Sequence, residues 1–410
     1  MQDFQLYQQI LGLESPWRVK SVKLQPQSGE LEVEVECTET MWGCPHCAAR
    51  MHVHEWEQRR WRHLDSCQFK TIIVARVPRV SCCEHGTQTV AVPWAEKFGR
   101  FSRLFERLAI DLMLECSVKA ACQILRISWD EADGIKQRAV VRGLERKKSQ
   151  PIKRLGVDEK AAGRGQDYVT VVARLEPGQA ATVEYVGDGR KQQALDAFWE
   201  SIPSEHLAGV QAVAMDMWDP YFNSTMQHVP GAASKIVHDP FHIARMLTEA
   251  VDKVRKQEHR SLMEEGDDTL IRTKYLWLHN WEGVPEKHVD QFDDLRTQRL
   301  KTGKAWALKE MFRDFWAAST ENQAQDHFDR WYSWAIRCRL EPIKKVAKTL
   351  KAHLPNLLTY FTHRITNAAL EGLNSRIAGL IKKACGYRNR HRFKNDILFH
   401  LGGLDLHPAQ

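Results

Sequence analysis

Residues 155–239 contain a series of short apolar strand patterns in an order that few folds accommodate. The strands are expected at 155–158, 168–173, 181–186, 209–216 and 235–239. The first three follow one another closely, which predicts an antiparallel meander. A helical pattern at 191–201 separates the third strand from the fourth, whose nearly unbroken apolar run suits a central strand buried on both faces.

This β-β-β-α-β-α-β order is that of the RNase H-like fold, in which the first and fourth strands lie side by side. Asp158 and Asp216 are predicted at the C-terminal ends of these two strands, where an open α/β sheet places its ligand sites. Two carboxylates would therefore converge, and hard oxygen ligands suit Mg²⁺ or Mn²⁺. Each aspartate taken alone is explained equally well as a residue that ends a strand or begins a loop.

A third carboxylate, Glu371, lies in a helical pattern that follows a long helical region. It stands beside the buried stripe formed by Leu370, Leu373 and Ile377. Asn367 and Asn374 flank it at helical spacing. A carboxylate at the margin of a buried face is usually solvated, and only the two aspartates favour a metal ligand here.

The cysteines are concentrated near the N-terminus, where six of the ten lie between Cys37 and Cys83. A β-hairpin is predicted at 18–36, a further strand at 71–77, and two ligand pairs, Cys44-x-x-Cys47 and Cys82-x-x-His85, follow them. That layout is typical of a zinc ribbon, and tetrahedral Zn²⁺ accepts such a set as a structural ion. The spacing leaves Cys83 open as an alternative to Cys82, with other substitutes at His46, His52, His54 and Cys67.

Three helical patterns with tight joints occupy residues 102 to about 148. Ser128 and Glu131 form a capping-box pattern at the start of the third helix. The arrangement fits a helix-turn-helix whose segment 128–141 enters the major groove. The residues predicted to contact DNA there are Ser128, Lys136, Arg138, Arg142, Arg146 and Lys147.

The charge distribution also favours a polyanionic partner. The formal net charge is only +7, but basic residues cluster at 136–154 and at 376–394, and the second stretch contains no acidic residue. Such runs are more often solvated helix faces. In the second cluster Arg376, Lys382, Lys383 and Arg388, with Arg390 and Arg392, are predicted to grip a DNA backbone.

The length of 410 residues excludes a single small binding module. No window of roughly 18 apolar residues could span a bilayer, and no secretion signal is evident, so we expect a cytoplasmic protein without a membrane partner. Residues 246–355 are predicted to be wholly helical, and we assign their six tryptophans to packing.

Three motifs together carry a resemblance to a known family. They are Gly156-Val157-Asp158-Glu159, the segment 214–221 around Asp216, and the segment 367–377 followed by Lys382 to Arg388. They resemble the catalytic motifs of the DDE transposases of the ISL-three group of bacterial insertion sequences. The resemblance extends over nearly the whole chain, because that family also begins with a zinc-binding segment and a helix-turn-helix.

The resemblance implies a catalytic triad of Asp158, Asp216 and Glu371 that holds Mg²⁺ or Mn²⁺. It implies binding to the terminal inverted repeats, cleavage there and joining of the 3′ ends to target DNA, with a homodimer or higher oligomer bound to the ends. Asp239-x-x-His242 is similar to an accessory element of related transposases, although a helix cap and a packed histidine explain it equally well.

The predicted fold is therefore multidomain α+β, with an RNase H-like core interrupted by an all-helical insertion. The expected parts are a zinc-binding β-rich domain at 1–95, a helix-turn-helix at 96–150, the first part of the core at 151–245, the insertion at 246–355 and the rest of the core at 356–410. Two alternatives stay open: a zinc-containing DNA-binding regulator, and an RNase H-like nuclease without strand transfer.

Overall fold

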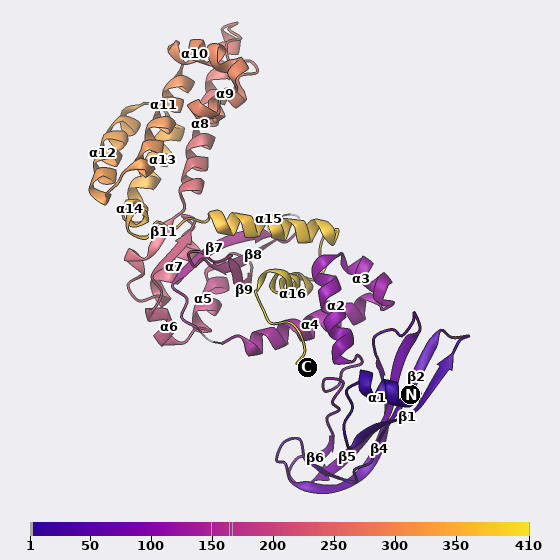
Figure 1. Cartoon of the computed structure of the whole chain (residues 1–410). Helices are drawn as coiled ribbons and strands as arrows, with labels where there is room; N and C mark the ends of the chain where they lie inside the picture. The colour runs from indigo at the N-terminus through magenta and orange to yellow at the C-terminus, as the bar shows by residue number, and fades with distance from the viewer. Residues whose placement is uncertain (1–2, 149, 164, 166, 410) are drawn as a thin grey trace. The chain divides into compact units, whose positions relative to one another are not determined.

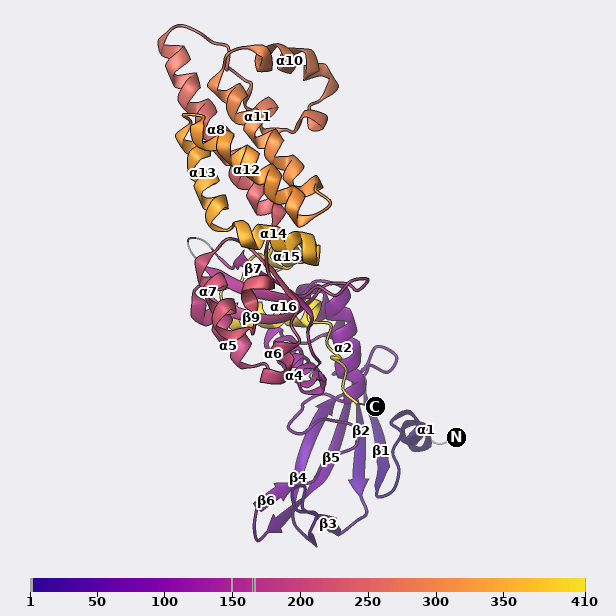
Figure 2. The same ribbon diagram turned by 90° about the vertical axis from the view of Figure 1, so that its left-hand side faces the viewer.

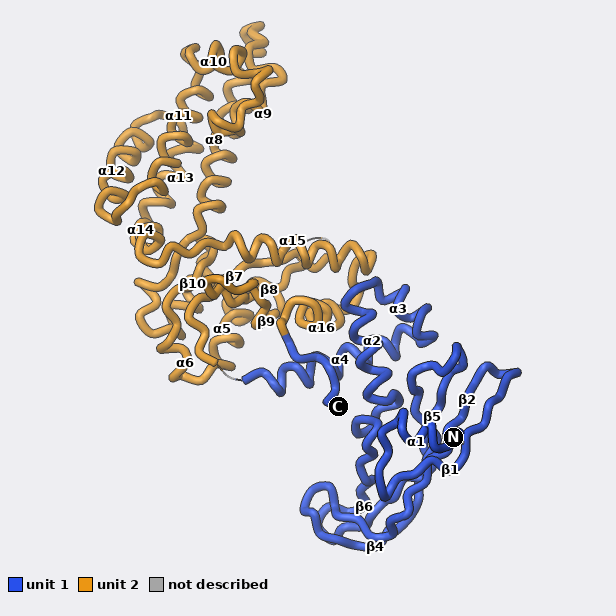
Figure 3. The backbone as a smooth tube through the Cα atoms, in the orientation of Figure 1, with its two compact units in different colours: residues 1–148, 404–410 blue, residues 149–403 orange. Residues whose placement is uncertain are grey.

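The computed structural model describes residues 3–148, 150–163, 165 and 167–409. The chain forms two compact units, Met1–Lys148 with Leu404–Gln410, and Ser149–Gly403 (Figure 3). The sequence assigns residues 356–410 to the part that carries Glu371, but the segment 404–410 belongs to unit 1 instead. The segment belongs to unit 1 because Arg146 Nη1 donates to Asp405 Oδ2 at 3.0 Å and His407 Nε2 lies 2.7 Å from Asp111 Oδ1.

A six-stranded sheet forms the N-terminal part of unit 1 (Figure 1). Its strand order is β1-β2-β5-β4-β3, and β6 pairs with the end of β5. The predicted hairpin is present as β1 and β2, with Gly29 at φ +68° in the turn. The elements are α1 (Asp3–Ile10), β1 (Trp17–Gln25), β2 (Glu30–Cys37), β3 (Met41–Gly43), β4 (Arg50–Arg62), β5 (Lys70–Cys82) and β6 (Gly86–Thr89).

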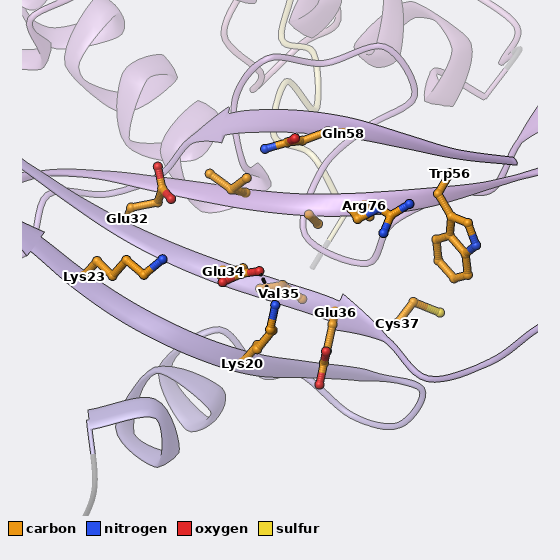
Figure 4. A pocket seen from close by; sticks show the side chains of 12 residues that line it. Lys20, Lys23, Glu32, Glu34, Val35, Glu36, Cys37, Trp56, Gln58 and Arg76 are labelled. Atoms are coloured by element: carbon orange, nitrogen blue, oxygen red, sulfur yellow. Dashed lines mark hydrogen bonds and ion pairs between the residues drawn. The ribbon is translucent and has the colours of Figure 1, made fainter.

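One face of this sheet carries a small aromatic core. Trp94 packs edge-on against Trp17 and Trp61, with ring centroids 5.0 and 5.3 Å apart, and all three rings are buried. The sheet also carries a pocket of about 440 Å³, where glutamates of β2 face lysines of β1 and Arg76 of β5 (Figure 4). The acidic and basic residues of the lining are equal in number, and Lys20 Nζ lies 2.7 Å from Glu34 Oε1, so the pocket lacks the basic excess of a nucleic-acid interface.

Three helices complete unit 1, as the sequence predicts: α2 (Arg103–Glu115), α3 (Val118–Leu125) and α4 (Trp129–Arg146). Ser102, Ser117 and Ser128 each cap the helix that follows them by accepting a backbone N–H. The predicted capping box is present, since Glu131 also accepts from the backbone of Ser128. Arg126 ends α3 in the left-handed conformation, which allows the tight turn into α4.

Unit 2 contains a five-stranded sheet of order β11-β10-β7-β8-β9. Strands β7, β8 and β9 form the predicted antiparallel meander, and β10 runs parallel to both β7 and β11. The order is therefore the one expected for an RNase H-like core. The strands are β7 (Arg154–Ala161), β8 (Tyr168–Arg174), β9 (Thr182–Asp188), β10 (Ala212–Met215) and β11 (Ile236–His238).

Helices cover both faces of the sheet (Figure 2). On one face, α5 and α7 contribute Phe198, Trp199 and Tyr221 to the core. On the other, α15 and α16 contribute Leu370, Leu373 and Phe393. The elements are α5 (Gln192–Glu200), α6 (Ser204–Ala208), α7 (Asp219–His228), η1 (Ala232–Ser234), α15 (Ala368–Lys383) and α16 (Arg390–Leu401).

The described elements of the insertion are all helices, as predicted, but the insertion begins earlier than 246. Its first helix starts at Pro240, because proline suits the first position of a helix. The elements are α8 (Pro240–Glu264), α9 (Lys274–Leu278), η2 (Trp281–Gly283), η3 (Glu286–His288), α10 (Val289–Thr297), α11 (Lys301–Arg313), η4 (Asp314–Ala317), α12 (Glu321–Arg337), α13 (Glu341–Ala352) and α14 (Leu354–His363). None of the helices described has the length and apolar character needed to cross a bilayer.

The six insertion tryptophans differ in burial, and Trp316 is partly buried against the insertion's core. Trp277, Trp306 and Trp331 are buried in the insertion's core, which confirms their assignment to packing. Trp281 and Trp334 each keep 37% of their surface exposed, so packing explains them only in part.

Candidate active site and metal centres

Four side chains from two turns converge in the N-terminal sheet. Cys44 and Cys47 lie between β3 and β4, Cys82 ends β5, and His85 precedes β6. Because β4 and β5 pair side by side, the two turns meet at one end of the sheet. The four ligand atoms lie within 4.8 Å of one another. The structure thus brings together the four residues that the sequence predicts.

The spacing of these atoms fits a tetrahedral zinc ion. Cys47 Sγ and Cys82 Sγ are 3.7 Å apart, and His85 Nδ1 lies 3.5 Å from Cys82 Sγ and 3.8 Å from Cys44 Sγ. With Zn–S bonds of about 2.3 Å, the edge of a tetrahedron is about 3.8 Å. The backbone N–H groups of Glu84 and His85 lower the pKa of the Cys82 thiol, which favours the thiolate that binds metal.

The alternative ligands stand outside this group. Cys83 and Cys67 are exposed, and neither is among the four converging residues. His46 stacks on the ring of His85 at 5.1 Å and so packs against the site. The geometry therefore favours Cys82 over Cys83.

In unit 2, Asp158 and Asp216 lie on adjacent parallel strands. Val157 pairs with Met215 in the register of β7 and β10, so the two aspartates directly follow this pair on neighbouring strands. Asp216 comes directly after β10, as predicted. Asp158 does not end its strand, because β7 continues to Ala161 by pairing with β8. The position that Asp158 occupies is the point where pairing with β10 stops.

His242 joins the two aspartates. One ligand atom of each of Asp158, Asp216 and His242 lies within 4.8 Å of the others. His242 stands in the first turn of α8, and its Nδ1 is 2.8 Å from Asp216 Oδ1 and 3.1 Å from Asp239 Oδ2. Asp239 is almost fully buried and is the residue before α8. The predicted accessory pair therefore belongs to the same site as the aspartates.

The charges of this site influence one another strongly. Burial, together with the neighbouring charge of Asp216, raises the pKa of Asp158 to about 6. Burial opposes the charged form of His242, but its hydrogen bonds to Asp216 and Asp239 outweigh burial and raise the pKa of His242 to about 10. Crowded carboxylates of this kind gain from a nearby cation.

Glu371 lies outside the cluster of three, in the first turn of α15. Its neighbours at helical spacing nevertheless contact the site. Asn374 Nδ2 donates to Asp158 Oδ2 at 2.6 Å, and the backbone N–H of Asn367 donates to Asp239 Oδ1 at 3.3 Å. Glu371 Oε1 is itself buried without a hydrogen-bond partner among the described residues. Glu371 therefore projects from the helix face that contacts the aspartates.

Asn367 and Asn374 are site residues to which the sequence assigns no role. Asn367 Nδ2 lies 3.5 Å from Val157 O, beside Asp158, and its side chain is fully buried. The only signal in the sequence is that both asparagines share a helix face with Glu371.

The basic residues of α4 differ in how they are placed. Arg142 is buried between Glu96 and Glu106, with its Nη2 2.7 Å from Glu96 Oε2 and 3.1 Å from Glu106 Oε2. Lys136 is also buried, at 4% exposure. We therefore correct the prediction that these two side chains contact DNA phosphates, because they lie inside the three-helix unit. Arg138 and Arg146 keep about a third of their side-chain surface exposed but pair with Glu106 and Asp405, and Ser128 and Lys147 lie at the two ends of the helix.

The second basic cluster is exposed. It begins on the C-terminal half of α15. Four exposed side chains of the cluster form no ion pair with another described residue, namely Arg376, Lys382, Lys383 and Arg388. Arg390 instead pairs with Asp167 and Asp188, and Lys394 with Asp188. The predicted basic surface is therefore available on α15 and in the loop after it.

Known families match three segments of the chain. Residues 155–397, more than half of it, match the ISL3-type DDE family described as "Transposase". Residues 40–85 match the "zinc-finger of transposase IS204/IS1001/IS1096/IS1165", and residues 90–140 match the "Helix-turn-helix domain of transposase family ISL3". The segments coincide with the converging cysteines, the three-helix unit and unit 2.

Two curated relatives resemble the chain over most of its length. The transposase for insertion sequence element IS1001 of Bordetella parapertussis is 28% identical over 393 residues, which cover 93% of this chain and 91% of the relative. The transposase for insertion sequence element IS1557 of Mycobacterium tuberculosis is 26% identical over 355 residues, 81% of this chain and 79% of the relative. With its zinc ribbon, its helix-turn-helix and its acidic α/β core, this chain belongs to the ISL3 family of transposases.

Proposed function

We propose that this transposase binds the terminal inverted repeats of its own insertion sequence, cuts the DNA there and joins the freed 3′ ends to target DNA. Asp158, Asp216 and Glu371 would hold Mg²⁺ or Mn²⁺ in this reaction. The observation that carries the proposal is the convergence of Asp158, Asp216 and His242 within 4.8 Å at the point where β7 and β10 separate.

The donor set fits a hard divalent cation. Carboxylate oxygens are the ligands that Mg²⁺ and Mn²⁺ prefer, and two of them crowd together here with a raised pKa at Asp158. The buried Oε1 of Glu371 has no partner among the described residues, which is costly unless a cation binds it. When bound, such ions would activate the attacking oxygen and stabilise the leaving one.

The other residues of the site would orient the carboxylates. Asn374 holds one oxygen of Asp158, while the Glu159 backbone N–H donates to the other at 2.7 Å. His242 fixes Asp216 through the 2.8 Å contact and is itself held by Asp239. We assign no general base to the chain, because the attacking oxygen is first that of water and then the 3′-hydroxyl of the DNA.

DNA recognition is divided between two surfaces in the proposal. In the helix-turn-helix, Ser128, Arg138, Arg146 and Lys147 would contact the inverted repeat. In unit 2, the basic surface of Arg376, Lys382, Lys383 and Arg388 would hold the backbone of the strand that is cut. Two element ends must be joined to one target, so we propose a homodimer as the minimal assembly.

The zinc ribbon would hold a structural ion. Cys44, Cys47, Cys82 and His85 supply four protein ligands, which leave no open position for chemistry. The ion would tie the turn after β3 to the turn after β5.

The test incubates the purified chain with a duplex that carries the candidate element end, in the presence of Mg²⁺ or Mn²⁺. We expect nicked and then joined products, and no products from Asp216→Asn although that variant binds the duplex as tightly as the parent. Binding without any product would point to a DNA-binding regulator. Nicked products that are never joined would point to a nuclease, and equal loss of binding and cleavage in Asp216→Asn would contradict the catalytic role.

A further inference from the structure

A pocket of about 720 Å³ in unit 2 is lined in part by residues that follow the end of β10. It is bordered by the segment 188–194 that leads from β9 into α5, by the start of α7, and by Arg390. Trp218 and Asp219 line it and follow Asp216 by two and three residues. The volume lies within the range of roughly 300 to 1,000 Å³ that is typical of small-molecule sites. We name it the α5–α7 pocket.

The indole of Trp218 forms part of the wall of the α5–α7 pocket, where it is exposed and held in a fixed orientation. Trp218 keeps 38% of its surface exposed although it is large and apolar. Its Nε1 donates to Arg190 O at 3.0 Å, and the Arg190 guanidinium lies 5.0 Å from its ring centroid. The same guanidinium lies 4.6 Å from the ring centroid of Tyr168 and pairs with Glu159 at 3.3 Å. Trp218 is thus held by Arg190, which is itself held by Tyr168 and Glu159.

The charges around the α5–α7 pocket suit a phosphate. Arg190, Lys191 and Arg390 line it together with Asp188 and Asp219, which leaves one positive charge in excess. Arg190 and Arg390 already pair with carboxylates. Lys191 is exposed and forms no ion pair with another described residue, so it is the cation available to a ligand.

An aromatic surface beside an available cation is the combination that binds unpaired nucleotides, because every base has a π face and every linkage has a charge. We propose that the α5–α7 pocket holds one unpaired nucleotide of the DNA strand that is cut, with its base stacked on Trp218 and its phosphate beside Lys191. The inference rests on the proposed function, since it assumes that the substrate bound at Asp216 is a DNA strand. The nucleotide next to the scissile phosphate is the nearest candidate.

Photocrosslinking of the full chain to DNA tests this assignment in an assay that does not depend on DNA cleavage. The probes are short single-stranded oligonucleotides and duplexes with a few unpaired bases, each with one 5-iododeoxyuridine, irradiated without divalent metal. We expect mass spectrometry to locate the crosslink at Trp218, and Trp218→Ala to remove it and weaken binding by about 5- to 150-fold. Trp218→Phe retains a ring and should retain much of the binding. Lys191→Ala should lower the yield.

The matched control is Trp334→Ala, because Trp334 has a similar exposure of 37% but lies in the insertion. It should leave the crosslink at Trp218 unchanged. Crosslinks at other aromatic residues but not at Trp218 would overturn the proposal. Complete protection by millimolar thymidine monophosphate would also overturn it, in favour of a free-nucleotide site. Cleavage of the end duplex is measured separately. Cleavage without the crosslink at Trp218 would refute only the nucleotide site in the pocket. The crosslink without cleavage would contradict only the proposed function.

Discussion

The Nδ1 atom of His242 lies 2.8 Å from Oδ1 of Asp216, and this contact links the first helix of the insertion to the end of the central strand β10. His242 is held in turn by Asp239, which is buried at the end of β11. The start of the insertion thus orients the Asp216 carboxylate, to which we assign a catalytic role.

Replacing His242 by glutamine should slow DNA cleavage. Glutamine keeps a polar side chain but loses the charge that faces two carboxylates, so Asp216 is oriented less well. Loss of such an orienting partner typically costs about 10- to 100-fold in activity. We expect a loss in that range at saturating Mn²⁺, with unchanged affinity for the end duplex in a binding assay.

The control for this variant is His228→Gln. His228 also contacts a carboxylate, Asp196, at 3.3 Å, but on the far end of α7. It should cleave at the parental rate. An equal loss in both variants would show that His242 acts through general stability of unit 2.

The zinc site offers a pair of neighbouring cysteines for comparison. Cys82→Ser should remove one of four converging ligands and so lower bound zinc to well under one ion per chain, whereas Cys83→Ser should keep it. Metal analysis of the purified full-length variants measures both. Full zinc in Cys82→Ser with loss in Cys83→Ser would reverse the ligand assignment.

Replacements of the exposed basic residues on α15 and of the buried Arg142 on α4 should affect the salt dependence of DNA binding differently. Each phosphate contact contributes a slope of about one to the dependence of log affinity on log salt concentration. Lys382→Ala and Lys383→Ala should each reduce that slope by about one, as measured by fluorescence anisotropy with the end duplex.

Arg142→Ala should leave the salt slope unchanged and lower stability instead. Its removal leaves Glu106 buried with one fewer partner, which costs about 3 kcal/mol in typical buried pairs. A denaturant titration measures the change. A reduced slope in Arg142→Ala would mean that this side chain reaches DNA after all.

The fold of unit 2 could be predicted because each strand carries its own local pattern. The unbroken apolar run of β10 requires burial on both faces, and all four of its residues are buried. The cysteine pairs were equally informative, since their spacing reflects the geometry of one ion. Such features depend on residues that are close together in the chain.

Contacts between distant residues could not be predicted in this way. Asn374 and Asp158 are 216 positions apart, and only the packing of α15 against β7 makes them partners. The burial of Arg142 depends on where Glu96 and Glu106 lie. The sequence of α4 alone does not reveal these partners, so it predicts an exposed side chain at Arg142. The extension of β7 past Asp158 depends on β8, because the polar residues Glu159 and Lys160 alone suggest a loop.

Unit 1 should lose stability in mild acid because of His63. This side chain is 3% exposed, and its Nδ1 lies 2.7 Å from Ser102 Oγ. Burial, with a smaller contribution from the charge of Arg62, lowers the pKa of His63 from 6.5 to about 4. The unfolded chain therefore takes up a proton at higher pH than the folded chain. Stability is complete above pH 6.5 and falls as the pH decreases towards 4, by about 3 kcal/mol in total.

Hydrogen exchange of β4 and β5 peptides in the full chain, compared between neutral pH and about pH 5 after correction for intrinsic rates, measures this loss. His63→Gln has no group to protonate and should show a smaller difference, whereas His54→Gln, at an exposed position within β4, should behave as the parent. If the acid sensitivity of β4 and β5 survives unchanged in His63→Gln, other groups cause it. The zinc ligands are the next candidates, because acid also protonates thiolates, and restoring zinc would then restore protection.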